Sequence, residues 1–330
     1  MATDLSVHYD FLDYAANSSL NDTNYLYSGT ASDRVSPLFS FSMQAAYAKY
    51  ANPILTSVPE YSGIVTVTTP LYQTTASASA EYQFAEKDTA TFSYKYSKVY
   101  YDNPQYLPNT SHDANAGFVY DFGRSRLKGR MNAGYSYYYF PGSLTDSAKI
   151  TIGFSRDIDE TWSILMDAGV RHTLSQFTMQ QFVPSTTQTT EVTVNKGGWG
   201  TVGNASLIYK GERTSGNLTY THDISPSPGW NGVAERYSVT LSAQRSLTYE
   251  LSVVLLLGYY SLRSDPSQFS INANKQNTSV VNTALYYAFS RDTRMDASFN
   301  NSWIENPVSG TVARRQSVYL RLSMQYPLFE

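Results

Sequence analysis

The residues that could do chemistry are few, and the histidines are the first to test. The sequence holds no cysteine and four histidines, His8, His112, His172 and His222. A nucleophilic hydrolase needs a histidine beside a serine and a third group that orients the ring. His172 and His222 fall on predicted strands that are not neighbours, so they form no such pair. With no metal-ligand spacing and no glycine-rich phosphate loop either, the sequence predicts no enzyme, no cofactor and no metal site.

Charged side chains are the second group, and they are sparse. They make up 15% of the chain, with 24 basic and 27 acidic residues and a net charge of −3. A soluble surface usually carries about 25–35% charged residues, whereas this chain is instead rich in tyrosine, with 29. The negative net charge argues against a nucleic-acid partner. The composition suits a wall with one face in lipid and the other in water.

Residues 71–101 show which elements position these charges. From Tyr72 to Phe84 the even positions carry Tyr, Thr, Ala and Phe, whereas the odd positions carry Gln, Thr, Ser and Glu. The alternation resumes after a four-residue break, from Ala90 to Ser97. A period of two predicts β-strands, and a short polar break predicts a hairpin. Aromatic residues near the ends of the apolar face are typical of strands that cross a bilayer.

The same pattern recurs along the whole chain and predicts about sixteen strands. They span residues 3–14, 23–31, 34–49, 71–84, 89–102, 112–122, 126–140, 147–156, 160–173, 199–210, 213–224, 233–245, 249–263, 276–290, 293–305 and 314–328. Tight turns, such as residues 31–34, alternate with longer connections, such as residues 141–146 and 174–198. Short periplasmic turns and longer extracellular loops are typical of outer-membrane barrels.

The predicted fold class is therefore all-β: one domain, residues 1–330, forming a transmembrane antiparallel up-and-down β-barrel. The alternative is a soluble protein of several β-sheets. Rows of alternate, mostly apolar residues would face lipid. Examples run from Met131 to Tyr139, Trp162 to Val170, Leu251 to Tyr259 and Val318 to Tyr326. A basic residue at mid-bilayer on that face costs about 2–4 kcal/mol, and almost every mid-strand charge falls on the other face.

Charges on the other face would line the lumen. The basic pore-lining candidates are Lys95, Arg130, Lys149, Arg171, Lys210, Arg236 and Arg321, and the acidic ones are Glu81, Asp113, Asp121, Asp167, Asp223, Glu250 and Asp296. Strongly charge-selective pores are expected to show an excess of one sign. A balanced, hydroxyl-rich wall suits a neutral or zwitterionic solute, or a glycan. The alternative is that these charges only pair with one another across neighbouring strands.

The longest apparent loop, residues 174–198, is the candidate to fold inward as a constriction. A barrel of sixteen strands is too wide for side chains to fill. The alternative is that residues 191–195 extend a strand beyond the membrane.

Both ends of the chain bear on export. The sequence opens MATDLSVHYDF, with no basic or apolar segment before the first strand, so we expect that a signal peptide has been removed. It ends with Tyr326-Pro-Leu-Phe-Glu330, which resembles the C-terminal signal for barrel insertion, although Phe329 is penultimate where a final aromatic is usual.

Residues 203–227, GNASLIYKGERTSGNLTYTHDISPS, carry a family resemblance. They resemble the outer-membrane β-barrel porins associated with exopolysaccharide operons and exosortase (PEP-CTERM) systems. In that family a Tyr-x-Gly-Glu-x-Thr-Ser turn joins two Ser/Thr-rich strands, and the corresponding residues here are Tyr209, Gly211, Glu212, Thr214 and Ser215. The resemblance implies a Gram-negative outer membrane and a conduit for secreted polysaccharide. It carries no functional residues with it.

We therefore expect a passive outer-membrane conduit for a hydrophilic solute, associated with polysaccharide export. One alternative is a general diffusion porin for small solutes. Another is a scaffold or sheath barrel for a periplasmic or electron-transfer partner. The expected partners are outer-membrane lipid, the hydrophilic solute or polysaccharide, and periplasmic export components.

Overall fold

The computed structural model describes residues 2–12, 21–51, 69–85, 87–123, 126–183, 188–227, 232–265, 269, 274–308 and 310–324. Sixteen strands form one antiparallel sheet in which each strand pairs with the next along the chain. The strands are β1 Ala2–Leu12, β2 Asp22–Ser36, β3 Phe39–Tyr50, β4 Leu71–Gln83, β5 Asp88–Tyr101, β6 Asn109–Asp121, β7 Leu127–Phe140, β8 Ser143–Asp157, β9 Trp162–Val183, β10 Gln188–Lys210, β11 Thr214–Pro226, β12 Val233–Ser246, β13 Leu251–Ser264, β14 Asn274–Ala288, β15 Thr293–Asn306 and β16 Thr311–Met324. Among these residues no helix has the length and apolar character needed to span a membrane.

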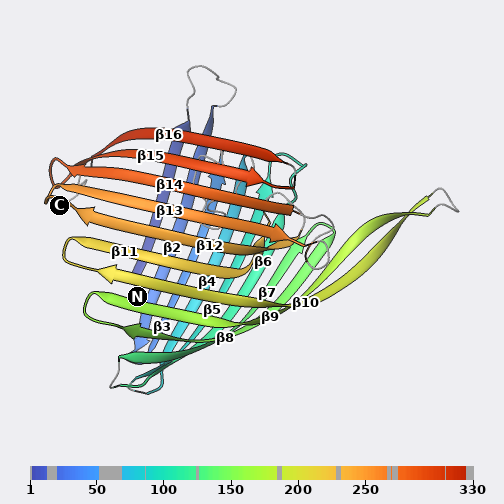
Figure 1. Cartoon of the computed structure of the whole chain (residues 1–330), viewed down its shortest axis with the longest axis horizontal. Coiled ribbons are helices and arrows are strands. Elements are labelled where there is room, and N and C mark those ends of the chain that lie inside the picture. The colour runs from blue at the N-terminus through green and yellow to red at the C-terminus, as the bar shows by residue number, and fades with distance from the viewer. Residues whose placement is uncertain are drawn as a thin grey trace.

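The sheet curls into a barrel, which confirms the predicted fold class. In Figure 1 strands β13 to β16 form the wall nearest the viewer, and β2 to β5 form the wall behind them. Strands β1 and β16 are the two edges of the sheet. These edges approach each other, because Asp10 on β1 lies close enough to Arg321 on β16 for their charges to interact.

The alternation of side chains places apolar residues outside the barrel and polar residues inside. Ile152 is 68% exposed on the outer face of β8, and Val318 is 77% exposed on that of β16. On the inner face, Thr145, Ser147 and Thr173 are buried, and the Ser147 and Thr173 hydroxyls lie 3.5 Å apart. This arrangement inverts that of a soluble protein and is what a wall between lipid and water requires.

The two rims of the barrel differ as the sequence predicts. At one rim the connections between strands are two to five residues long, and we call it the short-turn rim. At the other, the long-loop rim, the connections reach 20 residues. The turn between β8 and β9 shows how a short one is held. The Asp159 carboxylate accepts hydrogen bonds from the backbone N–H of Thr161 and of Trp162, each at 2.7 Å. These hydrogen bonds, with that from the Thr161 hydroxyl, hold the pKa of Asp159 below its usual value.

Two turns lie elsewhere than predicted. Strand β2 continues through residues 31–34 to Ser36, so the turn is Pro37-Leu38, where proline suits a turn because its φ is fixed. The Arg34 Nη2 donates to the Pro37 carbonyl at 2.7 Å. The predicted loop at residues 141–146 is a two-residue turn, Pro141-Gly142, with Gly142 at a φ of +81°. Glycine adopts that conformation without steric cost, so β8 begins at Ser143.

The predicted constriction by residues 174–198 is wrong wherever the structure describes that segment. Residues up to Val183 extend β9, and residues from Gln188 onward extend β10, in unbroken pairing. This ribbon projects away from the barrel (Figure 1). The alternative, in which residues 191–195 lengthen a strand beyond the membrane, is what the structure shows. Residues 184–187 lie outside the described residues.

Candidate functional site

The wall of the barrel splits between β10 and β11. Their ladder runs from Lys210 opposite Ser215 to Gly203 opposite His222. On the long-loop side of this ladder, residues 188–202 of β10 pair with β9 only. Residues 223–226 of β11 pair with β12 only. We call residues 223–226 and 233–236 the inner hairpin. They form the ends of β11 and β12 beyond the split.

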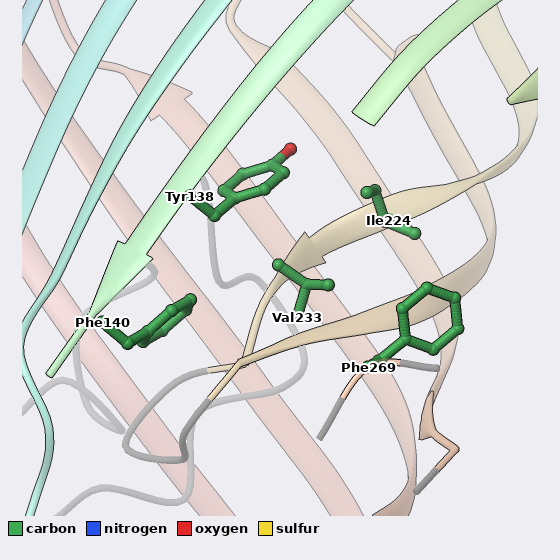
Figure 2. Packing of buried hydrophobic residues seen from close by; sticks show 5 residues of the cluster. All are labelled: Tyr138, Phe140, Ile224, Val233 and Phe269. Atoms are coloured by element: carbon green, nitrogen blue, oxygen red, sulfur yellow. The ribbon is translucent and has the colours of Figure 1, made fainter. Parts of the chain in front are cut away.

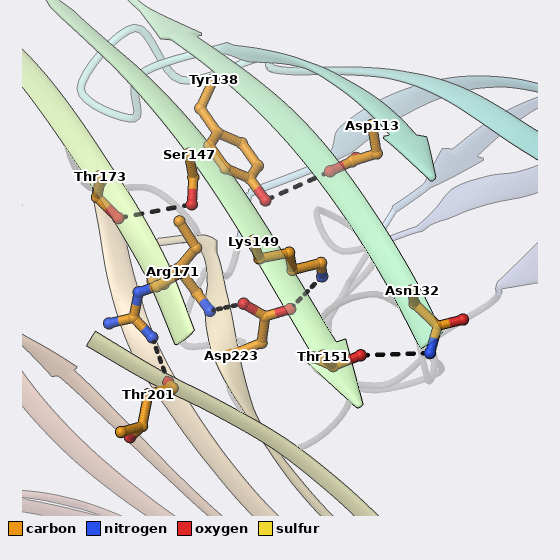
Figure 3. Close-up of polar contacts among 11 residues, drawn as sticks. Asp113, Asn132, Tyr138, Ser147, Lys149, Thr151, Arg171, Thr173, Thr201 and Asp223 are labelled. Carbon is orange, nitrogen blue, oxygen red and sulfur yellow. Dashed lines mark hydrogen bonds and ion pairs between the residues drawn. The ribbon is translucent and has the colours of Figure 1, made fainter. Parts of the chain in front are cut away.

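Two ion pairs show that the inner hairpin lies inside the barrel. Lys149 Nζ on β8 lies 2.5 Å from Asp223 Oδ2 on β11 (Figure 3), and Arg171 Nη2 on β9 pairs with Glu235 Oε1 on β12. Each pair joins strands three places apart in the sheet. Three strand spacings along a flat wall amount to about 14 Å. Glu235 also shares the outward face of β12 with Val239, so within a continuous wall it would point away from Arg171 on the inner face of β9. The inner hairpin therefore folds over the inner face of β8 and β9.

An apolar cluster holds the inner hairpin against that face. Figure 2 shows Tyr138 and Phe140 of β7 beside Ile224 of β11, Val233 of β12 and Phe269. We call these five residues the lumen cluster, and none is more than 7% exposed. Burying one large apolar side chain contributes about 1.5–3 kcal/mol. The cluster narrows the lumen at the long-loop rim.

Phe269 is the one residue of the lumen cluster that lies outside the strands, and no sequence pattern singles it out. It lies in the connection between β13 and β14, and its N–H donates to the Asp265 carbonyl at 2.9 Å. That connection has no alternating pattern, so one aromatic residue within it carries no directional signal. Phe269 thus reaches the lumen cluster from the β13–β14 connection, whereas the constriction considered from the sequence was residues 174–198.

Arg171 joins the inner hairpin, the lumen cluster and the wall. Its side chain is 1% exposed, and Nη1 donates to the Thr201 carbonyl at 2.9 Å (Figure 3). Its guanidinium carbon lies 5.6 Å from the centre of the Phe269 ring. The Arg171 side chain also lies against Gly200, where an added Cβ atom would be 2.7 Å from the guanidinium carbon. A buried arginine needs such partners, because an unpaired buried charge is costly.

Beside the inner hairpin, the inner wall forms a polar recess of about 390 Å³. Its lining includes Arg130 and Asp167, whose Nε and Oδ1 atoms lie 3.1 Å apart, together with the pair Lys149 and Asp223. Amides and hydroxyls supply most of the remaining lining, together with His222, and they belong to Thr91, Ser93, Asn115, Asn132, Thr151, Asn204 and Thr221. The charges of the recess balance, and it offers both donors and acceptors.

The other mid-strand candidates lie elsewhere on the barrel. Asp296 on β15 accepts from Arg321 Nε at 3.1 and 3.2 Å. The guanidinium of Arg236 lies 5.4 Å from the centre of the Tyr260 ring. Asp113 accepts from the Tyr138 hydroxyl at 3.4 Å and stands opposite Lys95 in the ladder of β5 and β6.

Four candidates lie at the short-turn rim. Glu250 stands in the turn before β13 and accepts from the Thr248 hydroxyl at 2.9 Å, although the sequence placed it within the strand. Asp121, at the end of β6, accepts from the Gly123 N–H at 2.7 Å. Lys210 and Glu81 line separate cavities of about 320 and 750 Å³. These residues surround the barrel mouth and are far from the lumen cluster.

Glu235, which the sequence did not single out, belongs to the site. Strict alternation puts it on the same face as Tyr237 and Val239, so the pattern predicts that it faces outward. The fold of the inner hairpin turns this face toward β9. Among the described residues no cluster of histidine, aspartate and glutamate could hold a metal ion.

Comparisons with known proteins support the fold. The sequence matches no protein-family model and no curated protein. Among solved structures, the copper transporter OprC has a TM-score of 0.58 at 7% identity, over 98% of this chain and 62% of its own. The ferric-catecholate import receptor Fiu from E. coli K12, in its open form, has a TM-score of 0.53 at 10% identity, over 97% of this chain and 69% of its own. Several other matches are longer still, and the chain spans 52% of the ferric citrate transporter FecA, with a TM-score of 0.52 at 10% identity over 87% of this chain. The chain thus has the fold of an outer-membrane β-barrel.

Proposed function

We propose that this chain is an outer-membrane conduit for uncharged or zwitterionic hydrophilic solutes, closed in the described conformation by the inner hairpin. The observation that carries the proposal is the polar inner wall, narrowed at one rim by the lumen cluster. In this arrangement the short-turn rim faces the periplasm and the long-loop rim faces outward, as in bacterial barrels.

The solute class follows from the polar recess. Its charges are matched in the pairs Arg130–Asp167 and Lys149–Asp223. A charged solute would have to break a pair, whereas a polyhydroxylated solute can exchange its hydrogen bonds with water for those to amides and hydroxyls. The resemblance to exopolysaccharide-associated porins favours polysaccharide as the cargo. It also favours outer-membrane lipid and periplasmic export components as partners.

The lumen cluster also favours a second candidate, a scaffold barrel whose lumen stays closed. That barrel would anchor a periplasmic or electron-transfer partner and would not conduct. The two candidates differ in what happens when the cluster is disrupted. Replacing Val233 by aspartate would place a charge among apolar side chains, which is costly without a partner.

The test is conductance in planar bilayers and swelling of liposomes with neutral sugars of graded size. For a conduit, we expect a small conductance in the unmodified protein, and a larger one with faster sugar entry for Val233→Asp. Val308→Asp, 59% exposed in the turn between β15 and β16 and outside the lumen cluster, is the matched control and should leave conductance small. A folded Val233→Asp barrel that neither conducts nor admits sugar would exclude the conduit and favour the scaffold.

A further inference from the structure

The inner hairpin carries the sequence pattern of a wall strand. On β11 the outward row is Leu218, Tyr220, His222 and Ile224, and on β12 it is Val239, Tyr237, Glu235 and Val233. Below the split these rows face outward, as Leu218 and Val239 do, each 42% exposed. Above it, Ile224 is 7% exposed and Val233 is fully buried. The alternation thus continues unchanged into a segment that has separated from β10, although Glu235 and Arg236 remain paired with β13.

The edge of β10 is shaped to receive this segment. Continuing the register beyond Gly203 and His222 would place Val202 opposite Asp223, Thr201 opposite Ile224 and Gly200 opposite Ser225. Backbone groups on a strand edge seek partners. The Thr201 carbonyl accepts from the Arg171 guanidinium in the described conformation. Arg171 therefore satisfies an edge carbonyl that β11 does not pair with.

We propose that the inner hairpin is a gate with two positions. In the position described here it closes the lumen, held by Glu235 on Arg171, by Asp223 on Lys149 and by the lumen cluster. In the other position it returns to the wall, where residues 223–226 extend the ladder on β10. The lumen cluster then separates, and Ile224 and Val233 face outward at the rim. This gate regulates the proposed conduit and rests on that function.

Both positions contain comparable interactions, which is what a switch requires. The closed position has two ion pairs and the buried cluster. The open position replaces them with backbone hydrogen bonds along β10 and with contact between apolar side chains and lipid. A ligand or partner that favours either position would shift the equilibrium between them.

The natural absence of cysteine allows disulfides to test the open position. In that position Thr201→Cys and Ile224→Cys stand opposite each other on one face, with Cβ atoms about 4.5–5.5 Å apart. We expect mild oxidation in liposomes to join them. Ala205→Cys with Tyr220→Cys, already opposite in the ladder, is the positive control. Thr201→Cys with Ser225→Cys is out of register, with side chains on opposite faces, and should stay reduced.

Conductance links the disulfide to gating. We expect the oxidised Thr201→Cys, Ile224→Cys barrel to conduct several-fold more than the unmodified protein, and a reductant to reverse the change. The gate is overturned if this cysteine pair stays reduced while the positive control oxidises. It is also overturned if the pair oxidises without changing conductance, although Val233→Asp raises the conductance of the same barrel. Absence of conductance in every folded variant would instead contradict the conduit itself.

Discussion

Arg171 on β9 and Glu235 on β12 form an ion pair although β10 and β11 lie between them in the sheet. The pair can exist only because the sheet parts between β10 and β11, so that the end of β12, which stays paired with β13, folds over the inner face of β9. The Arg171 side chain is 1% exposed and that of Glu235 is 22% exposed, so little water screens the contact. This contact holds the ends of β11 and β12 against the inner face of β9.

Removing the carboxylate should release the inner hairpin. Glu235→Gln leaves the buried Arg171 charge without its counter-ion, and breaking one partner of a buried pair costs about 3–5 kcal/mol. We expect greater single-channel conductance and a lower temperature of unfolding. The unfolding temperature is read from the different electrophoretic mobility of the folded and the heat-unfolded barrel. Glu81→Gln, at an exposed position on the short-turn rim, is the control and should change neither. Unchanged conductance in Glu235→Gln would show that the pair does not hold the barrier.

Gly200 should be intolerant of a side chain for the same reason. A Cβ atom there would lie 2.7 Å from the Arg171 guanidinium carbon and would displace it. We expect Gly200→Ala to raise conductance in the same direction as Glu235→Gln, and the double variant to add little to either. Gly216→Ala, whose Cβ would lie 3.5 Å from the nearest atom, the Ser242 carbonyl oxygen, is the matched control. Full additivity of the two changes would contradict a shared contact.

The charges of the recess are matched in number, so an opened barrel should be weakly ion-selective. In the Glu235→Gln background, Lys149→Gln leaves one excess negative charge in the recess, so we expect a shift toward cations. Asp223→Asn leaves one excess positive charge, so we expect a shift toward anions. The double variant should return to the starting selectivity. Reversal potentials in a salt gradient measure all three, and shifts of one sign for both single variants would refute the charge balance of the recess.

The turn at Asp159 predicts a pH dependence. Its pKa is lowered in the folded chain, chiefly by the hydrogen bonds from Thr161. The carboxylate therefore stabilises the fold above its unfolded pKa, and that contribution is lost as pH falls through the lower, folded value. We expect Asp159→Ala to unfold at a lower temperature than the unmodified protein at pH 7. The difference should shrink below pH 4, and a constant difference down to strongly acidic pH would contradict this origin.

The sequence predicts the barrel well because a single physical rule governs every strand. A residue in the wall faces either lipid or water, so alternation alone reveals strands such as β9 and β13. The turns at Pro37 and Gly142 were misplaced because their strands continue the alternation through polar residues. The inner hairpin could not be predicted at all, since its pattern is that of a wall strand. Its position depends on contacts with Phe269 and Arg171, which are distant in sequence.

In the proposed conduit, one water-filled lumen lies behind the wall and is closed at the long-loop rim. Thiol labelling of neighbouring single cysteines on β8 tests it most directly, with a membrane-impermeant maleimide in liposomes that hold the barrel in one orientation. We predict that Thr151→Cys, on the recess, reacts when the reagent is on the short-turn side, and reacts from the long-loop side only after Glu235→Gln. Ile152→Cys, 68% exposed on the outer face and so covered by lipid, should stay unreactive from both sides. Reaction at position 152 with protection at position 151 would contradict the account.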